Sequence, residues 1–378
     1  MKKIAALLLA LCLTLGACAA LADGAIKIST IGPLTGDYAA YGKAVANALV
    51  LAVDEANAQG GIQFEVLEPQ DDQGDGTLAL NAYNKLMDDG MQVLLGTVTS
   101  GACSSVAGSA VGERVFLLTP SASSDVVPAA GDNVFQICFT DTTQGVKAAE
   151  YIKEKNLGTK IGIIYNNAQD YSMGIAKSFR DKAGELGIEI VKEAAYSDDK
   201  AADFSTQVND MKNAGCDLVF IPIYYTPAYK ILAYAKSIEY DATFFGVDGM
   251  DGILTLEGFD TSLAEGVYLL TPFSADATDE LTVNFVNAYK EKCGGEIPNQ
   301  FAADAYDCVY AIKQACEAAG VTGDMSADEI CTKLVEQFTS MTFSGLTGTE
   351  MTWNENGEVT KSPKAVQIQN GVYVGVGD

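Results

Sequence analysis

The sequence predicts an α/β protein with two Rossmann-like lobes, each a mostly parallel sheet flanked by helices. Apolar runs of strand length alternate with apolar positions at helical spacing through most of the chain. This alternation forms two successive β-α-β series of similar size, which predicts two lobes and not one large sheet. The chain has 378 residues, of which 48% are hydrophobic and 20% charged, so it can build two well-packed cores.

The first series begins with the apolar run 26–31. Apolar residues at helical spacing from Val45 to Ala56 predict the first helix, and Gly60 and Gly61 end it. The turn 71–76 caps the next expected helix, 77–89. Further strands are expected at 64–67, 91–95, 115–118 and 134–139.

The second series begins at Asp141. Helices are expected at 141–154, around 175–186 and at 204–214, and a further helix is expected to end at Ile238. The strands between and after them are expected at 161–165, 188–195, 218–223, 243–245 and 267–271. Helical spacing returns at 279–292, 301–319 and 326–338, and the tail alternates at 351–354, 365–369 and 372–376. Asn370-Gly371 between two apolar runs predicts a hairpin.

No Gly/Ser-rich linker separates the two series, so we expect pieces of the tail to complete both lobes. The predicted first lobe contains residues 24–142 and 273–347. The predicted second lobe contains residues 143–272 and 348–378.

The first 22 residues are typical of a secretory signal peptide. Lys2 and Lys3 precede the apolar run 4–15, which is too short to span a bilayer as a final helix. The stretch 15–18 resembles the lipobox of bacterial lipoproteins and predicts lipidation at Cys18. An ordinary cleavage site after Ala22 is the alternative. Either route predicts an extracytoplasmic protein, tethered to the membrane by its lipid in the first case and free in the second.

Composition excludes several classes of function. A net charge of −26 argues against binding nucleic acid through a basic patch. The absence of histidine from the sequence removes His-dependent catalytic triads and His-ligated metal sites, so we expect no enzyme, cofactor or metal. Seven cysteines follow the leader, and no two of them form a C-x-x-C pair. The sequence does not decide whether Cys316 and Cys331 form a disulfide bridge.

Two polar turns predict a ligand site. The turn 96–103 joins a buried strand to a helix, and Ser100 suits either the N-cap or a direct ligand contact. A helix N-terminus favours an anion. The turn 119–124 follows the next strand, so the two turns converge at one crevice. Two capped helices without a ligand are the alternative interpretation.

An ordered set of motifs resembles the extracytoplasmic binding proteins of branched-chain amino acid ABC transporters. The motifs are Ile31-Gly32-Pro33-Leu34-Thr35-Gly36, Tyr41-Gly42, Ala52-Val53-Asp54-Glu55-Ala56-Asn57, Gly60-Gly61-Ile62, Asp71-Asp72, Val98-Thr99-Ser100-Gly101, Thr119-Pro120-Ser121-Ala122-Ser123 and Glu265-Gly266-Val267-Tyr268. The resemblance implies a type I periplasmic binding protein, with two lobes joined by three crossings that close on a ligand. It also implies a monomer that delivers an amino acid, branched-chain by default, to an ABC permease. A ligand sensor, or a carrier of an amide, urea or another amino acid, is the alternative.

The resemblance also implies roles for single residues. Ser100, Ala122 and Ser123 would hold the α-carboxylate of the ligand. Asp248, at a position where glutamate is frequent, would bind the α-ammonium between Tyr171 and Tyr224. Tyr41, Thr97 and Val98 would line the side-chain pocket. Without the resemblance, Asp248 is an ordinary turn residue and the tyrosines are ordinary packing residues.

Overall fold

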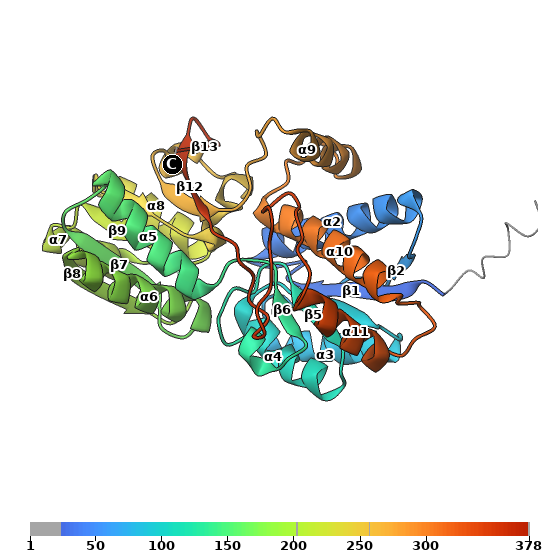
Figure 1. Cartoon of the computed structure of the whole chain (residues 1–378). Coiled ribbons are helices and arrows are strands. Elements are labelled where there is room, and N and C mark those ends of the chain that lie inside the picture. Colours follow the sequence, from blue (N-terminus) through green and yellow to red (C-terminus); the bar gives the residue numbers. More distant parts are fainter. Residues whose placement is uncertain (1–23, 202, 257, 377–378) are drawn as a thin grey trace, which may run out of the picture.

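The computed structural model describes residues 24–376 except 202 and 257, and it shows two lobes, each built on its own sheet (Figure 1). The strands of the first lobe are β1 (Ile26–Gly32), β2 (Phe64–Val66), β3 (Gln70–Asp71), β4 (Val93–Thr97), β5 (Phe116–Thr119) and β6 (Val134–Gln136). They pair in parallel in the order β2-β1-β4-β5-β6, and β3 also pairs with β1.

The second lobe contains a seven-stranded sheet in the order β13-β12-β11-β10-β9-β7-β8. Its strands are β7 (Ile161–Asn166), β8 (Ile190–Tyr196), β9 (Leu218–Phe220), β10 (Thr243–Phe245), β11 (Tyr268–Thr271), β12 (Lys364–Gln369) and β13 (Val372–Gly375). The last two strands form the predicted hairpin and pair antiparallel at one edge. The α/β class with two mostly parallel sheets is therefore confirmed.

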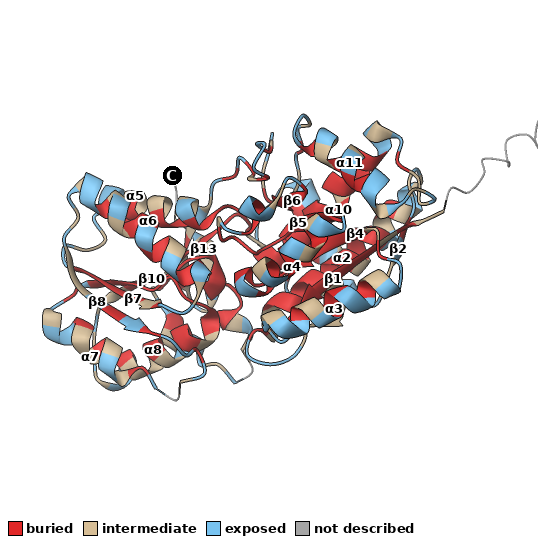
Figure 2. Ribbon diagram, turned by 90° about the horizontal axis from the view of Figure 1, so that it is seen from below, coloured by how far each residue is buried: buried red, intermediate tan, exposed pale blue. Residues whose placement is uncertain are grey.

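Helices cover both sheets. They are α2 (Ala39–Gln59), α3 (Gly76–Asp88), α4 (Ser100–Gly112), α5 (Asp141–Lys155), α6 (Asp170–Leu186), α7 (Ser205–Ala214), α8 (Tyr225–Ser237), α9 (Glu280–Lys292), α10 (Gln300–Ala319) and α11 (Ala327–Phe338). Buried side chains lie on the strands and on the helix faces turned toward them, and the outer helix faces are exposed (Figure 2). Asp75 caps α3 as predicted, because its carboxylate accepts from the N–H groups of Thr77 and Leu78.

The chain passes between the lobes three times. The first crossing joins β6 to α5, the second joins β11 to α9, and the third enters β12. Helices α9, α10 and α11 return to the first lobe, where α10 packs along α2. The predicted strand 134–139 ends early, at Gln136, because the following residues leave the sheet at the first crossing.

The expected strand 351–354 is not a continuous strand. It consists of isolated bridges, Phe343 to Met351 and Trp353 to Val359. The indole N–H of Trp353 donates to the Gln136 carbonyl at 2.7 Å, so this segment packs on the first lobe. We therefore propose that residues 348–361 belong to the first lobe, beyond the boundary expected at residue 347.

Candidate functional site

The two polar turns of the first lobe meet as predicted. The Ser121 hydroxyl donates to the Val98 carbonyl at 2.6 Å, and the Ser124 N–H donates to the Ser100 hydroxyl at 3.2 Å. Both turns stand at the carboxyl ends of neighbouring parallel strands, β4 and β5. This adjacency places the N-terminus of α4 and its partial positive charge at one wall of the cleft between the lobes.

Ser100 is the first residue of α4, and the N-cap is Thr99, whose side chain makes no capping bond. Of the two roles that the sequence left open for Ser100, the N-cap position is therefore taken by the preceding residue, Thr99. Its hydroxyl instead accepts the N–H of the second turn, and Ser100 still lines the cavity between the lobes. Thr99 thus holds the N-cap position, and Ser100, the next residue, lines the cavity.

The second lobe contributes a buried carboxylate. Asp248 follows β10 and is 3% exposed. Its Oδ1 accepts from the Tyr171 hydroxyl at 2.6 Å and from the Gly249 N–H at 2.7 Å. The Asp248 N–H donates to Gln144 Oε1 at 3.1 Å. Burial raises the pKa of Asp248 to about 7, although the hydrogen bonds from Tyr171 and Gly249 oppose this shift.

Aromatic rings from both lobes close the site. The rings of Tyr171 and Tyr224 stack with centroids 4.7 Å apart. Tyr41 approaches from the first lobe, lies edge-on to Phe301 at 4.7 Å, and donates its hydroxyl to the Gly249 carbonyl. The lobes therefore touch through aromatic faces and through a direct hydrogen bond, beside Asp248.

The cavity between these groups has a volume of about 10 Å³. That is roughly the space that one water molecule needs, so an amino acid fits only when the lobes move apart. Six of the nine predicted site residues line it, and they are joined there by Thr99, Ser121, Gly249 and Phe301. The six are Tyr41, Val98, Ser100, Tyr171, Tyr224 and Asp248.

The other three predicted residues lie behind this cavity. The Ala122 N–H donates to the Thr119 hydroxyl at 2.9 Å, and the Ser123 hydroxyl donates to Asp141 Oδ1 at 2.8 Å. Thr97 is fully buried at the end of β4, where its carbonyl accepts from Thr119. All three support the two turns in this arrangement of the lobes.

Sequence reasoning missed Asp141, which begins α5 directly after the first crossing. Its carboxyl group is fully buried, and burial raises its pKa well above the ordinary value, against the hydrogen bond from Ser123. Gln144, one turn further along, connects Ser123 to the Asp248 backbone. The only signal in the sequence was one more polar residue after a strand, which is common at helix starts.

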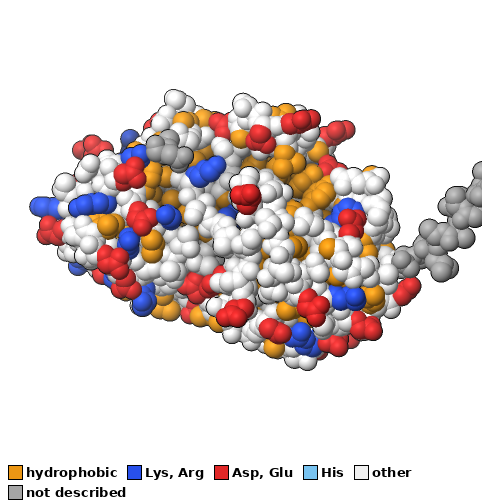
Figure 3. All heavy atoms as spheres, in the orientation of Figure 1, with side chains coloured by type: hydrophobic (Ala, Val, Ile, Leu, Met, Phe, Trp, Pro, Cys, Tyr) orange, Lys and Arg blue, Asp and Glu red, His pale blue; other side chains and the backbone are white. Residues whose placement is uncertain are grey.

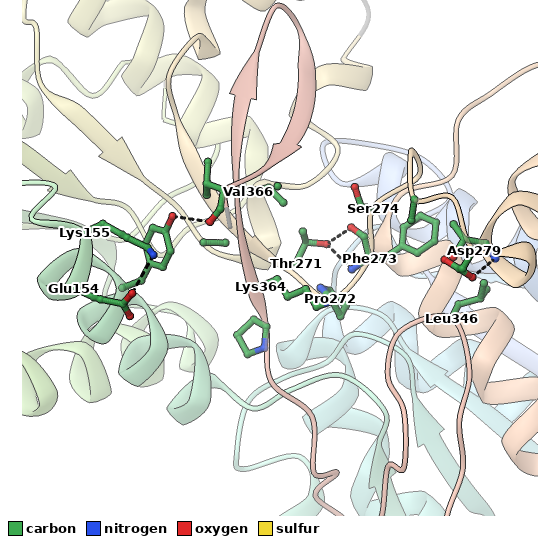
Figure 4. A pocket seen from close by; sticks show the side chains of 17 residues that line it. Glu154, Lys155, Thr271, Pro272, Phe273, Ser274, Asp279, Leu346, Lys364 and Val366 are labelled. Carbon is green, nitrogen blue, oxygen red and sulfur yellow. Dashed lines mark hydrogen bonds and ion pairs between the residues drawn. The ribbon is translucent and has the colours of Figure 1, made fainter. Parts of the chain in front are cut away.

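A larger cavity, of about 550 Å³, lies at the crossings. Figure 4 shows it between Lys155, from the second lobe, and Asp279, from the first. Several of its polar groups already have partners: Lys155 pairs with Glu154 at 3.0 Å, and Tyr151 donates to the Val376 carbonyl. We therefore place the candidate site at the smaller cavity, where a buried carboxylate faces a helix N-terminus.

The described residues contain no group of three or more Asp, Glu, Cys or His side chains arranged to hold a metal ion. The seven cysteines after the leader are unpaired in this part of the chain, so the Cys316–Cys331 bridge left open by the sequence is not formed. On the face seen in Figure 3, acidic and basic side chains are interspersed and form no single patch.

Comparison with known proteins identifies the family. A family model described as periplasmic binding protein matches residues 25–372. The chain belongs to the periplasmic binding protein family. The Leu/Ile/Val-binding protein BraC3 of Rhizobium johnstonii is 31% identical over 90% of this chain and 91% of that protein. The resemblance to the branched-chain amino acid binding proteins is thereby confirmed.

Solved structures of this periplasmic binding protein family support the same assignment. The substrate binding protein LivJ of Streptococcus pneumoniae, solved in complex with isoleucine, is 30% identical, with a TM-score of 0.83 over 93% of this chain and 98% of that one. The leucine binding protein LivK of Thermotoga maritima is 25% identical, with a TM-score of 0.82 over 93% and 98%. The family consists of binding proteins for transport.

No helix among the described residues of this periplasmic binding protein is long and apolar enough to cross a membrane. The predicted signal peptide, residues 1–22, and the predicted lipidation site, Cys18, lie outside the described residues.

Proposed function

We propose that this protein is an extracytoplasmic receptor that captures a branched-chain amino acid between its lobes and delivers it to an ABC permease. One observation carries the proposal. The buried Asp248 carboxylate of one lobe and the Ser100 turn of the other line the same small cavity. A carboxylate opposite the N-terminus of a helix is complementary to a zwitterion.

The ligand ammonium would bind at Asp248, flanked by Tyr171 and Tyr224. The ligand carboxylate would bind at Ser100. Ala122 and Ser123 follow Ser121 in the same turn. They would contact the carboxylate when the cavity widens, and their donors would then leave Thr119 and Asp141. Hydrogen bonds to charged groups contribute roughly 1.5–3 kcal/mol each, so both ends of the ligand add substantially to affinity.

Part of the remaining wall is apolar or aromatic. Tyr41, Val98 and Phe301 line the cavity beside Thr99, Ser121 and Gly249, and Thr97, which precedes Val98 in the chain, is fully buried. Such a wall favours an aliphatic side chain. This choice agrees with the names of similar proteins, a Leu/Ile/Val-binding protein and LivJ in complex with isoleucine.

Binding follows an opening and closing cycle. The cavity of about 10 Å³ must widen before an amino acid enters. A ligand that contacts Asp248 in one lobe and Ser100 in the other then stabilises the closed lobes by its differential affinity. We propose that the receptor is a monomer without enzymatic activity. Either a lipid on Cys18 tethers it, or it is released after Ala22.

A thermal-shift screen of the mature protein against all common amino acids tests the function. Leu, Ile or Val should raise the melting temperature, because a ligand at about 100 times its Kd stabilises the folded state by roughly 2.7 kcal/mol. Asp248→Ala should abolish the shift, and Ser100→Ala should reduce it. Stabilisation only by uncharged amides or sugars would reject an amino acid ligand.

A further inference from the structure

A hydrogen bond between the lobes lies outside the cavity. The Tyr38 hydroxyl, at the start of α2 in the first lobe, donates to Asp199 Oδ2 in the second lobe at 2.6 Å. Tyr38 is 8% exposed and Asp199 is 7% exposed. Neither residue lines the cavity of about 10 Å³ between the lobes. This contact therefore joins the lobes without occupying ligand space.

The second lobe holds the acceptor in place. Asn166, at the end of β7, donates to Asp199 Oδ1 at 2.7 Å, and Gln169 donates to Oδ2 at 2.7 Å. Both donors precede α6 in the same lobe as Asp199. The carboxyl group is therefore oriented before Tyr38 arrives, so little side-chain ordering is needed when the lobes meet.

Tyr38 also contacts the ligand-facing rings. Its ring lies edge-on to Tyr224 at 4.9 Å and stacks near Tyr41 at 6.3 Å. Tyr224 in turn stacks on Tyr171, the hydroxyl partner of Asp248. These ring contacts connect Tyr38 to the aromatic wall of the proposed ligand site.

We propose that Tyr38 and Asp199 form a latch that stabilises the closed lobes independently of the ligand and slows release of a bound amino acid. The latch rests on the proposed function of amino acid capture. Neither residue lies in the three crossings, so rotation of the lobes about those crossings separates the two groups and returns them to water. Tyr38 is a positioning residue, since it acts through closure and through Tyr224.

The release rate of L-leucine tests the latch. We expect Tyr38→Phe, which keeps the ring and removes the hydroxyl, to speed release in stopped-flow measurements about tenfold, the effect of one net hydrogen bond to a charged group. Tyr83→Phe is the matched control, since the Tyr83 hydroxyl donates to Glu113 at 2.9 Å within the first lobe. The control should release leucine at the wild-type rate.

A second single variant and a double variant show whether faster release comes from loss of the latch or from a general loss of structure. Asp199→Asn should also speed release, and Tyr38→Phe/Asp199→Asn should release leucine no faster than the faster single variant, because the two changes remove one interaction. Melting temperatures of the latch variants should match that of Tyr83→Phe. Equal release rates for wild type and Tyr38→Phe, or fully additive effects, would overturn the latch.

Small-angle scattering without added amino acid distinguishes failure of the latch from failure of the proposed function. If wild type does not bind leucine, the proposed function fails, and scattering still reports closure. Tyr38→Phe should then show a larger radius of gyration than wild type, because more molecules are open. Equal radii would overturn a latch that acts without ligand.

Discussion

The hydroxyl oxygen of Tyr171 lies 2.6 Å from Oδ1 of Asp248, and both side chains are almost completely buried. Tyr171 lies in the first turn of α6 and Asp248 follows β10, so two separate elements of one lobe bring the hydroxyl and the carboxylate together. The pair faces the Ser100 turn of the other lobe across a cavity of about 10 Å³. This arrangement supplies the cation-binding end of the proposed site.

Asp248→Asn should weaken binding of L-leucine by roughly 10- to 150-fold. The amide keeps the size of the side chain, but it loses the charge that pairs with an ammonium, a loss of roughly 1.5–3 kcal/mol. Isothermal titration calorimetry measures the change. Asp181→Asn, on the exposed side of α6, makes the same chemical change away from the cavity and should leave the Kd unchanged. Equal affinities of Asp248→Asn and wild type would place the ammonium elsewhere.

Affinity for leucine should fall in acid. The pKa of Asp248 is raised by burial to about 7, and an ammonium favours the ionised carboxylate. Below that pH the site must lose a proton before it binds, so the Kd should rise by up to about tenfold per pH unit between about pH 7 and pH 5. Calorimetry across this range checks the slope, and a Kd independent of pH would contradict the assignment.

Without amino acid, Asp248 should make folding stability depend on pH. Its folded pKa is raised above the ordinary value of 3.8, so its stabilising contribution is complete below about pH 4 and is lost as the pH rises through about 7. Asp248→Asn does not titrate. Its melting temperature relative to wild type should therefore increase between about pH 4 and pH 8. A constant difference would show that Asp248 titrates alike in both states.

Gly249→Ala should weaken ligand binding. A Cβ at Gly249 would overlap the Tyr171 hydroxyl, so that hydroxyl has to shift from its position beside Asp248. We expect at least a tenfold loss of leucine affinity with a folded protein, measured by calorimetry and circular dichroism. Gly108→Ala in α4 is the control, because a Cβ there meets nothing within 4 Å; it should bind normally and gain roughly 0.5–1 kcal/mol.

Lys361 should anchor the crossings. Its ammonium donates to the Ile137 carbonyl at 3.0 Å, to Thr347 at 2.6 Å, and to Asp304, with both ionic side chains buried. Lys361→Met leaves Asp304 buried without its partner and should cost roughly 3–5 kcal/mol in urea unfolding. The double variant with Asp304→Leu should recover most of this loss. Lys85→Met, in an exposed pair with Asp89, should change stability by less than about 0.5 kcal/mol.

Local patterns predicted most of the fold. Helical spacing and the capping turn 71–76 located α2 and α3, and the two polar turns at 96–103 and 119–124 met as expected. The sequence did not predict the structure where it depends on a helix end shifted by one residue or on a contact with a distant segment. The sequence left Ser100 open between an N-cap and a ligand contact, and the N-cap position belongs to Thr99. The expected strand 351–354 is held by bridges to its neighbours and does not join a sheet.

The sequence by itself determined the order of strands and helices, the polar turns at strand ends and the acidic surface, because these follow from contacts between near neighbours and from composition. Only the tertiary structure decided which side chains meet between the lobes. Tyr41 reaches Gly249 from 208 positions away, and Tyr38 reaches Asp199 from 161 positions away. Such pairs depend on the angle at which two separately folded lobes close, and no local periodicity encodes that angle.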